Sequence, residues 1–232
     1  MMQPARIGRI GGHRQFSAVV GAAIVAIALG VSFAGAEALK TVQLPPPQTD
    51  GGKPLMQALK LRATSRSFAP DPIPPQTLSN LLWAAWGINR PGEGKRTAPS
   101  ARNWQEIDVL LVDAKGVWRY NAVANALEQL AAGDLRPLAG TQEFVKDAPL
   151  TLVFVADPTR MKGSEAATRE AYAWADAAFV SQNVYLFCAS EGLATGVRAM
   201  VDRPALAKAF GLGADRIIAF AQSVGYPRRN DP

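Results

Sequence analysis

The segment from about Ala167 to Ser190 constrains the fold more than any other part of this chain. A predicted helix there carries Ala, Trp, Phe, Val and Leu on most of its faces. A helix that is apolar nearly all round is a buried helix. We therefore expect other elements to surround it, in part from a second subunit, and we expect Gly192 to cap its C-terminus.

Helix and strand patterns alternate along the rest of the chain, which predicts a layered α+β fold. The runs Ile107–Val112 and Val117–Tyr120 flank a turn and indicate a hairpin. The all-apolar run Leu150–Ala156 is typical of a central strand. Two further strands are predicted at 196–201 and 216–224. Helices are predicted from Pro54 to about residue 66, from Leu78 to Trp86, and at 125–132, 141–146 and 203–210.

The first 36 residues differ in composition from the rest. Three arginines precede an uncharged apolar stretch, Phe16–Phe33, and Ala34-Gly35-Ala36 has the small residues of a cleavage site. This pattern predicts a signal peptide cleaved after Ala36, and hence export to the periplasm. The alternative is an uncleaved membrane anchor. Residues 37–53, rich in Pro and Gly, are expected to be an extended leader to a domain over 54–232.

Removal of residues 1–36 changes which functions the composition allows. It takes three of the 25 basic residues and none of the 19 acidic ones, so the net charge falls from +6 to +3 and nucleic-acid binding is not expected. The only histidine, His13, also leaves, which excludes Ser-His-Asp catalysis and HExxH zinc sites. We predict no catalytic side chain and no metal ligand, and expect a cofactor to carry the chemistry.

Two short segments have the composition of a ligand site. Arg62 and Arg66 are four residues apart, with hydroxyls between them, so in a helical turn they would share a face that suits a phosphate. The alternative is a solvated basic helix end. The second segment, 96–106, combines arginines, hydroxyls, an indole and the amides Asn103 and Gln105, which could bind a flat polar anion. The alternative there is turn formation and capping.

Polar residues elsewhere leave two readings open. Asp176 and Asn183 interrupt the apolar helix, and because buried polar groups need partners, we expect them to fix helix contacts rather than touch a ligand. Arg228 and Arg229 follow the last predicted strand. They are either further cations of the site or a frayed basic tail.

Six short motifs then occur in order along the chain. They are R-x-T-x-R-x-F at 62–68, L-L-W-A-A-W-G-I-N-R at 81–90, R-T-A-P-S-A-R-N-W-Q-E at 96–106, D-A-A-F-V-S-Q-N at 176–183, E-G-L at 191–193 and V-G-Y-P at 224–227. Together they resemble the nitroreductase family of FMN-dependent oxidoreductases over nearly all of residues 54–229.

This resemblance implies an intertwined α+β homodimer whose central mixed or antiparallel sheet is flanked by helices. It implies two FMN sites at the subunit interface and ping-pong transfer of two electrons, as a hydride through the flavin N5. NAD(P)H or another donor would supply the electrons, and a nitroaromatic, a quinone or another small molecule would accept them. Hydride transfer of this kind needs stacking and positive charge near the N1/O2 edge of the flavin rather than a general base.

The resemblance also assigns cofactor contacts to four groups of residues. The group that would hold the phosphate, the ribityl chain and the pyrimidine edge comprises Arg62, Ala63, Thr64 and Arg66. The group that would approach the ring from the partner subunit comprises Ser100 and Asn103. The group that would line the ring, with a backbone N–H near N5, comprises Val197, Arg198, Ala199 and Met200. Arg228 or Arg229 would complete the phosphate clamp.

Two positions depart from the family pattern, and two other functions stay open. Thr64 stands where the family usually has Ser, which keeps the hydroxyl, and Ala199 stands where many members carry a Glu that faces the ring. One alternative function is an azoline-type dehydrogenase that acts on a modified peptide. The other is a flavin-binding protein without turnover, because NAD(P)H is a cytoplasmic donor and an exported enzyme would need another one.

Overall fold

The computed structural model describes residues 39–228 of the chain. The predicted signal peptide and Arg229 lie outside the described residues. Within residues 39–228, the helices are all too short or too polar to cross a membrane.

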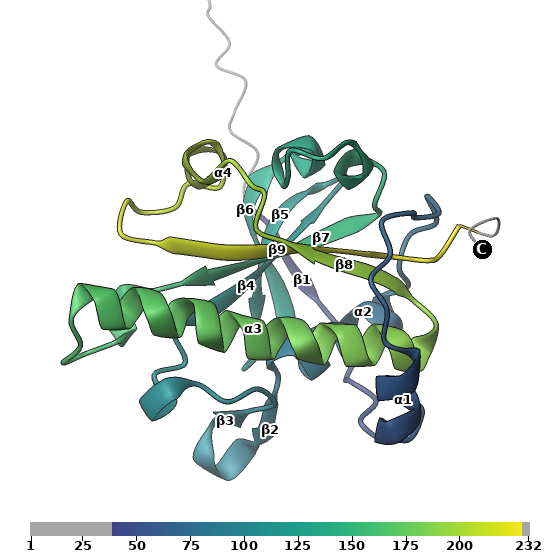
Figure 1. Ribbon diagram of the computed structural model, residues 1–232, viewed down its shortest axis with the longest axis horizontal. Helices are drawn as coiled ribbons and strands as arrows, with labels where there is room; N and C mark the ends of the chain where they lie inside the picture. Colours follow the sequence, from purple (N-terminus) through teal and green to yellow (C-terminus); the bar gives the residue numbers. More distant parts are fainter. Residues whose placement is uncertain (1–38, 229–232) are drawn as a thin grey trace, which may run out of the picture. The chain divides into compact units, whose positions relative to one another are not determined.

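A seven-stranded sheet forms the middle of the described chain (Figure 1). Its strand order is β1-β6-β5-β4-β7-β9-β8, and every neighbouring pair is antiparallel. The strands are β1 (Thr41–Gln43), β4 (Ile107–Asp113), β5 (Gly116–Asn121), β6 (Ala126–Ala132), β7 (Leu150–Ala156), β8 (Ala194–Arg198) and β9 (Ile217–Gly225). A separate small hairpin joins β2 (Ile88–Arg90) to β3 (Lys95–Arg96).

The predicted central strand is confirmed. All seven residues of β7 are buried, and the strand pairs with β4 on one side and β9 on the other. A strand that is covered on both faces carries apolar residues at every position instead of alternating with polar ones. The hairpin of β4 and β5 lies where its turn residues predicted it.

Helices cover both faces of the sheet, as the α+β prediction requires. On one face α3 (Ala166–Glu191) contacts β7, β8 and β9, and α1 (Leu55–Leu61) and α2 (Pro75–Trp86) pack beside it (Figure 1). The core on the other face is closed by α4 (Arg203–Ala209) and the short 3-10 turns η3 (Arg136–Leu138) and η4 (Glu143–Lys146). Gly192 ends α3 at a φ of 72°, which confirms the predicted cap.

Three predicted elements are wrong or displaced. The helix predicted at 125–132 is instead strand β6 at 126–132, because pairing with β5 and β1 outweighs the helix propensity of Ala, Leu, Glu and Gln. The first helix ends at Leu61, so residues 62–66 are extended and do not share a helical face. The strand predicted at 196–201 is β8, which ends at Arg198 where its pairing with β9 stops.

Residues 39–53, within the predicted leader, contribute a strand to the sheet. This strand, β1, pairs with β6, and the carbonyl of Lys40 accepts the N–H of Gln129 at 2.8 Å. Further along, the carbonyl of Pro45 accepts from Ser79 at 2.6 Å, and the backbone N–H of Lys53 donates to Ser190 at 2.7 Å. The segment therefore runs from the outer edge of the sheet to the end of α3.

A pair of buried carboxyl groups holds the 96–106 segment against α3. Asp176, 2% exposed, accepts the backbone N–H of Ala101 at 2.8 Å through Oδ2. Glu106 is fully buried beside it, and neither of its carboxyl oxygens receives a hydrogen bond from the described residues. Burial, together with the hydrogen bond and charge of Asp176, raises the pKa of Glu106 to about 8, although a backbone hydrogen bond and Arg160 oppose the shift. In its protonated form Glu106 can donate to Asp176, which resolves the missing contact.

Replacing Glu106 by Gln is expected to remove a pH dependence of stability. Glu106 keeps its proton in the folded chain up to about pH 8, whereas its ordinary pKa is 4.5. The folded state therefore binds more protons across this window, so the free energy of unfolding falls as pH rises from about 5 to 8. At pH 9 we expect Glu106→Gln to be more stable than the wild type by about 2 kcal/mol, since a buried unpaired charge is lost.

Urea unfolding at pH 5, 7 and 9 measures this difference. Glu170→Gln, an exposed substitution on α3, is the matched control and should leave the pH profile unchanged. Parallel profiles for the wild type and Glu106→Gln would contradict the assignment.

Candidate functional site

Three segments that are distant in sequence meet beside the C-terminal half of α3. The backbone N–H of Ser65 donates to the carbonyl of Thr195 in β8 at 2.9 Å. The contact is close: a Cβ added at Gly196 would lie 2.7 Å from the carbonyl oxygen of Ser65. This position therefore needs glycine so that the 62–66 segment can lie along the edge strand.

Tyr185 of α3 joins this segment to β8. Its hydroxyl lies 2.9 Å from the Thr64 hydroxyl and accepts the backbone N–H of Val197 at 3.0 Å. The guanidinium of Arg62 lies over the Tyr185 ring at 5.3 Å from its centroid. The tyrosine is 7% exposed, so a nearly buried side chain fixes three predicted site residues at once.

The structure places Arg228 beside Phe68, two residues after Arg66. Phe68 forms an isolated antiparallel bridge with Pro227, and the backbone N–H of Ala69 donates to the carbonyl of Tyr226 at 2.9 Å. Arg228 itself donates to the carbonyl of Phe68 at 3.3 Å. Arg66 and Arg228 are both exposed, and neither forms an ion pair among the described residues. Arg62, Arg66 and Arg228 therefore add positive charge to the 62–68 part of the chain.

The side chain of Arg198 lies elsewhere. It is 7% exposed, on the face of the sheet opposite α3, and donates to Ser223 at 2.9 Å and to the carbonyl of Ala139 at 2.7 Å. Burial lowers its pKa to about 10. This guanidinium links η3 to the sheet. If residue 198 lines the flavin ring, only its backbone can do so. Ala199 and Met200 follow β8 and are exposed.

Hydrogen bonds of the Gln105 side chain stabilise the 96–106 segment, whereas the sequence suggested that this side chain could bind a ligand. Gln105 accepts from Arg96 Nε at 2.8 Å and donates to the carbonyl of Gly94 and to Asn103 Oδ1, each at 3.0 Å. Its amide is therefore used within the segment. Ser100 and Asn103 remain the better ligand candidates, because Asn103 is exposed and Ser100 half-buried.

The backbone of this segment is strained. Arg102, Asn103 and Gln105 have φ values of 49°, 54° and 50°. Such left-handed conformations are uncommon for residues with a side chain and persist where the surrounding contacts impose them. The hydrogen bond from Ala101 to Asp176 is one such contact.

Within one chain the two groups of predicted site residues stay apart. The 62–66 segment lies at Tyr185, whereas the 100–103 segment lies at Asp176, nine residues earlier on α3. At 1.5 Å per residue that separation is about 14 Å along the helix. A single ligand that touches Thr64 does not reach the same chain's Ser100 with its other end unless it is that long.

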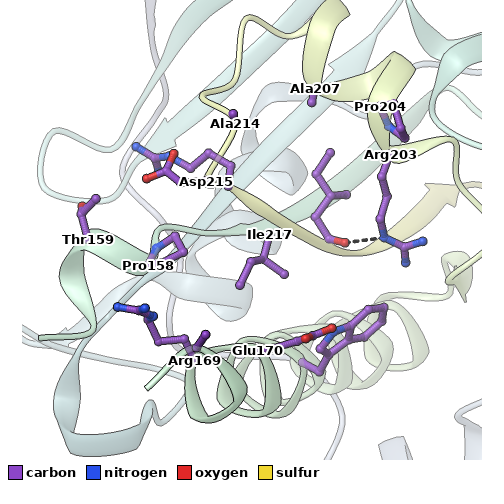
Figure 2. Close-up of a pocket in the computed structure, with 14 residues that line it drawn as sticks. Pro158, Thr159, Arg169, Glu170, Arg203, Pro204, Ala207, Ala214, Asp215 and Ile217 are labelled. Carbon is purple, nitrogen blue, oxygen red and sulfur yellow. Dashed lines mark hydrogen bonds between the residues drawn. The ribbon is translucent and has the colours of Figure 1, made fainter. Parts of the chain in front are cut away.

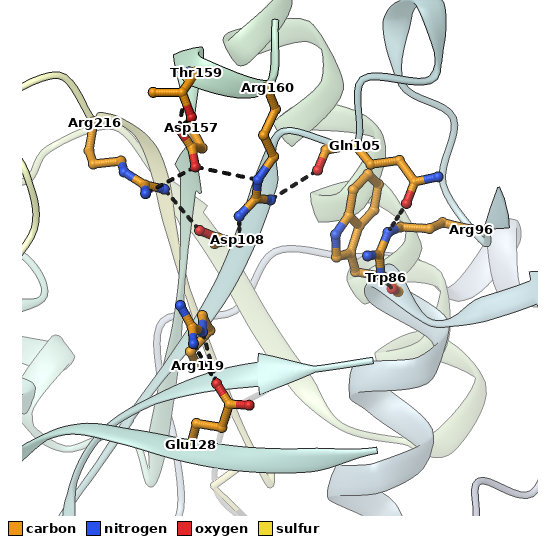
Figure 3. A network of polar contacts seen from close by, with 10 residues as sticks. All are labelled: Trp86, Arg96, Gln105, Asp108, Arg119, Glu128, Asp157, Thr159, Arg160 and Arg216. Carbon is orange, nitrogen blue, oxygen red and sulfur yellow. Dashed lines mark hydrogen bonds and ion pairs between the residues drawn. The ribbon is translucent and has the colours of Figure 1, made fainter. Parts of the chain in front are cut away.

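A network of paired charges borders the 96–106 segment (Figure 3). The carboxylate of Asp108 accepts from Arg160 at 2.8 Å and from Arg216 at 3.1 Å, and Arg216 also pairs with Asp157 at 3.0 Å. Burial raises the pKa of Asp157, but hydrogen bonds from Thr159 and the two guanidiniums outweigh it and leave the pKa below its usual value. Arg160 and Arg216 are therefore paired with carboxylates of the same chain, and their role is structural.

Arg96 is held in a similar way. Its guanidinium lies over the Trp86 ring at 4.9 Å and donates to the Trp86 carbonyl at 2.9 Å (Figure 3). Burial lowers its pKa from the usual value. Trp86 is 3% exposed and belongs to the core, whereas Trp83 is half-buried.

Two residues that matter to this arrangement were not singled out in the sequence. Tyr185 could have been found, because a tyrosine in an apolar helix needs a partner for its hydroxyl. Glu106 could have been found as an acid directly before a buried strand, but its neighbour Asp176 is 70 positions away and only the fold brings them together. The expectation that Asp176 and Asn183 fix helix contacts agrees with their bonds to Ala101 and to the carbonyl of Ala84.

Known proteins of the same fold place this geometry in a family. The family model described as "Nitroreductase family" matches residues 59–226. A nitroreductase-family structure from Ralstonia eutropha JMP134 is 41% identical, with a TM-score of 0.79, and the match covers 82% of this chain and 90% of that one. A Methanocaldococcus jannaschii relative is 29% identical over 155 residues, 61% of this chain and 76% of its own.

A more distant structure, from Desulfovibrio desulfuricans, is a nitroreductase-family protein in complex with FMN. It is 19% identical, with a TM-score of 0.56 over 78% of this chain and 91% of that one, so it shows a shared fold. The family model spans well over half of the chain, and the Ralstonia protein shares both fold and sequence with it. The chain therefore belongs to the nitroreductase family of oxidoreductases.

Proposed function

We propose that this protein is an FMN-dependent oxidoreductase that passes two electrons from NAD(P)H or another donor to a nitroaromatic, a quinone or another small acceptor. The observation that carries the proposal is that Tyr185 holds Arg62, Thr64 and the backbone of Val197 beside the edge strand β8. Arg66 lies in the same short segment, and Arg228 bonds to Phe68, two residues after Arg66. The complex of a fold relative with FMN supports the same cofactor.

The donor set fits a flavin mononucleotide. A phosphate is bound well by guanidiniums that have no carboxylate partner, and Arg66 and Arg228 meet that condition among the described residues. The Thr64 hydroxyl suits the polar ribityl chain, and the end of β8 at Val197, Ala199 and Met200 offers backbone groups to a ring. Bound flavin supplies the hydride chemistry, and the chain orients it and provides positive charge.

The second half of the site is proposed to come from a partner subunit. Ser100 and Asn103 flank the residue that Asp176 holds, whereas Thr64 is held at Tyr185, nine residues further along α3, and we propose that they approach the flavin of a partner subunit. The outer face of α3 carries Tyr172 and Phe179, which are 43% and 49% exposed, with alanines between them. A homodimer across this face would cover the apolar helix surface and pair each 62–66 segment with a 100–103 segment.

Export remains part of the proposal. Residues 1–36 have the pattern of a signal peptide, with a membrane anchor as the alternative if the segment is not cleaved. An exported enzyme would need a donor other than cytoplasmic NAD(P)H.

The function is tested by purifying the chain, recording its absorbance spectrum over the flavin bands, and reducing it anaerobically with NADH and with NADPH. A colourless protein that takes up no added FMN would refute it, and bound flavin without NAD(P)H oxidation would favour a non-catalytic role.

Arg66→Ala is expected to reduce FMN retention by about a hundredfold in affinity, since a charge-assisted contact to phosphate is worth about 1.5–3 kcal/mol. The measurement is flavin content after gel filtration, followed by titration of the apoprotein with FMN. Arg119→Ala is the control, because Arg119 pairs with Glu128 at 2.5 Å in the hairpin of β5 and β6. Unchanged flavin content in Arg66→Ala would show that this arginine does not hold the phosphate.

Tyr185→Phe is expected to weaken FMN binding by about tenfold without loss of folding. The substitution keeps the ring that packs under Arg62 but removes the hydroxyl that contacts Thr64 and the N–H of Val197. Two hydrogen bonds of about 1 kcal/mol each position these groups. Ser79→Ala, which removes a buried hydroxyl that donates to the carbonyl of Pro45, is the control and should leave the FMN affinity unchanged. An unaltered FMN affinity with an altered melting temperature would assign Tyr185 to stability alone.

Phe179→Asp is expected to produce monomers that retain little flavin, because a charge in an apolar interface is costly and the partner's half of the site is lost. We expect the dimer dissociation constant to rise by about a hundredfold or more. Analytical ultracentrifugation and flavin content measure the two effects. Val123→Asp, at an exposed apolar position in the turn between β5 and β6, is the control. A Phe179→Asp protein that stays dimeric would place the interface elsewhere.

A further inference from the structure

A second cavity, of about 760 Å³, opens between the first half of α3, α4, the 3-10 turn η5 (Pro158–Arg160) and the start of β9 (Figure 2). This volume is in the range of small-molecule sites. None of the residues that line it belongs to the proposed flavin contacts. It is therefore a separate feature of the chain, and it stands whether or not flavin binds.

Part of the inner surface of the cavity is apolar. Ile217 lies between the walls formed by α3 and α4, and Pro204 and Ala207 face it from α4 (Figure 2). Trp174 closes the side on α3, where its ring packs edge-on against Phe220 with centroids 4.9 Å apart. Such a surface suits a small flat ring.

One wall carries a guanidinium that the protein holds in place. Arg203 donates through Nε to the carbonyl of Ile218 at 2.8 Å and through Nη2 to the carbonyls of Ala219 and Ala199 at 3.1 and 3.3 Å. Its Cζ lies 5.1 Å from the centroid of the Trp174 ring. Carbonyl groups accept its hydrogen bonds but do not neutralise its charge. Within residues 39–228 Arg203 forms no ion pair, and its Nη1 donates no hydrogen bond.

The other charges around the cavity define what could pair with Arg203. Arg216 is already neutralised by Asp108 and Asp157. Arg169, on the opposite wall from Arg203 in Figure 2, has no ion pair in the described part of the chain. Glu170 and Asp215 also line the cavity, but both are exposed and lie more than 4.0 Å from either guanidinium. The fixed, partly buried charge in the cavity is therefore positive.

We propose that this cavity binds a flat aromatic carboxylate. The ring would lie on Ile217, Pro204 and Ala207, and the carboxylate would accept from the free Nη1 of Arg203. A guanidinium that is already oriented loses little freedom when it binds a carboxylate, which makes this contact stronger than one to a mobile surface lysine. Arg169 adds attraction from across the opening.

Titration calorimetry of the full chain with benzoate tests the proposal, with benzamide, benzylamine and acetate as comparison ligands. We expect benzoate to bind at least tenfold more tightly than each of the other three. Arg203→Gln and Arg169→Gln should each weaken benzoate binding, Arg203→Gln by tenfold or more. Lys208→Gln removes a charge from the same short helix outside the cavity and should leave the affinity within twofold.

Ala207→Phe keeps the arginines and fills the apolar surface, so it should abolish binding even if Arg203→Gln fails to fold. The proposal is overturned if benzamide or benzylamine binds as tightly as benzoate, because the negative charge of the ligand would then not contribute to binding. It is also overturned if Ala207→Phe leaves benzoate affinity unchanged, or if benzoate does not bind. Each measurement is independent of flavin content, so its failure is distinct from a failure of the proposed oxidoreductase function.

Discussion

The contacts of α3 hold the rest of the structure in place. Small residues on its inner side, such as Ala173 and Ala177, are fully buried, so the helix lies close against the sheet. Its polar residues then act at fixed points along its length. Asp176 holds the 96–106 segment, Ser181 bonds to Gln222 of β9 at 2.8 Å, and Tyr185 holds the 62–66 segment. Because the helix is rigid, these contacts set the positions of the site segments relative to one another.

Much of this arrangement could be predicted from the sequence. The composition of the 167–190 segment predicted the helix α3, the apolar run 150–156 predicted the central strand, and the glycine at 192 predicted the end of the helix. Burial of α3 on nearly all faces was also predicted, but within the described residues its outer face is exposed at Tyr172 and Phe179. The motif resemblance predicted the fold family, and two of the residues that it singled out, Arg62 and Thr64, both contact Tyr185. These features depend on local patterns or on motifs in register.

Other features could not be predicted, because they depend on partners distant in the chain. Residues 126–132 favour a helix by composition, yet β5 and β1 impose a strand on them. Arg198 belongs to a motif that resembles a cofactor contact, but alternation along β8 turns its side chain into the core of the opposite face. The amide of Gln105 was predicted to contact a polar ring, but it forms hydrogen bonds with Arg96 and with the carbonyl of Gly94 instead.

The pairing of β1 with β6 has a consequence for how the chain can be processed. β1 forms one edge of the sheet, and its first contact, the Lys40 carbonyl on Gln129, lies only four residues after Ala36. Proteolytic trimming past Lys40 would strip the outermost strand and leave the N–H and C=O groups of β6 unpaired. An open edge of this kind recruits strands from other molecules. Strand β1 therefore protects the edge of β6 from pairing with other molecules, and its loss is expected to promote aggregation.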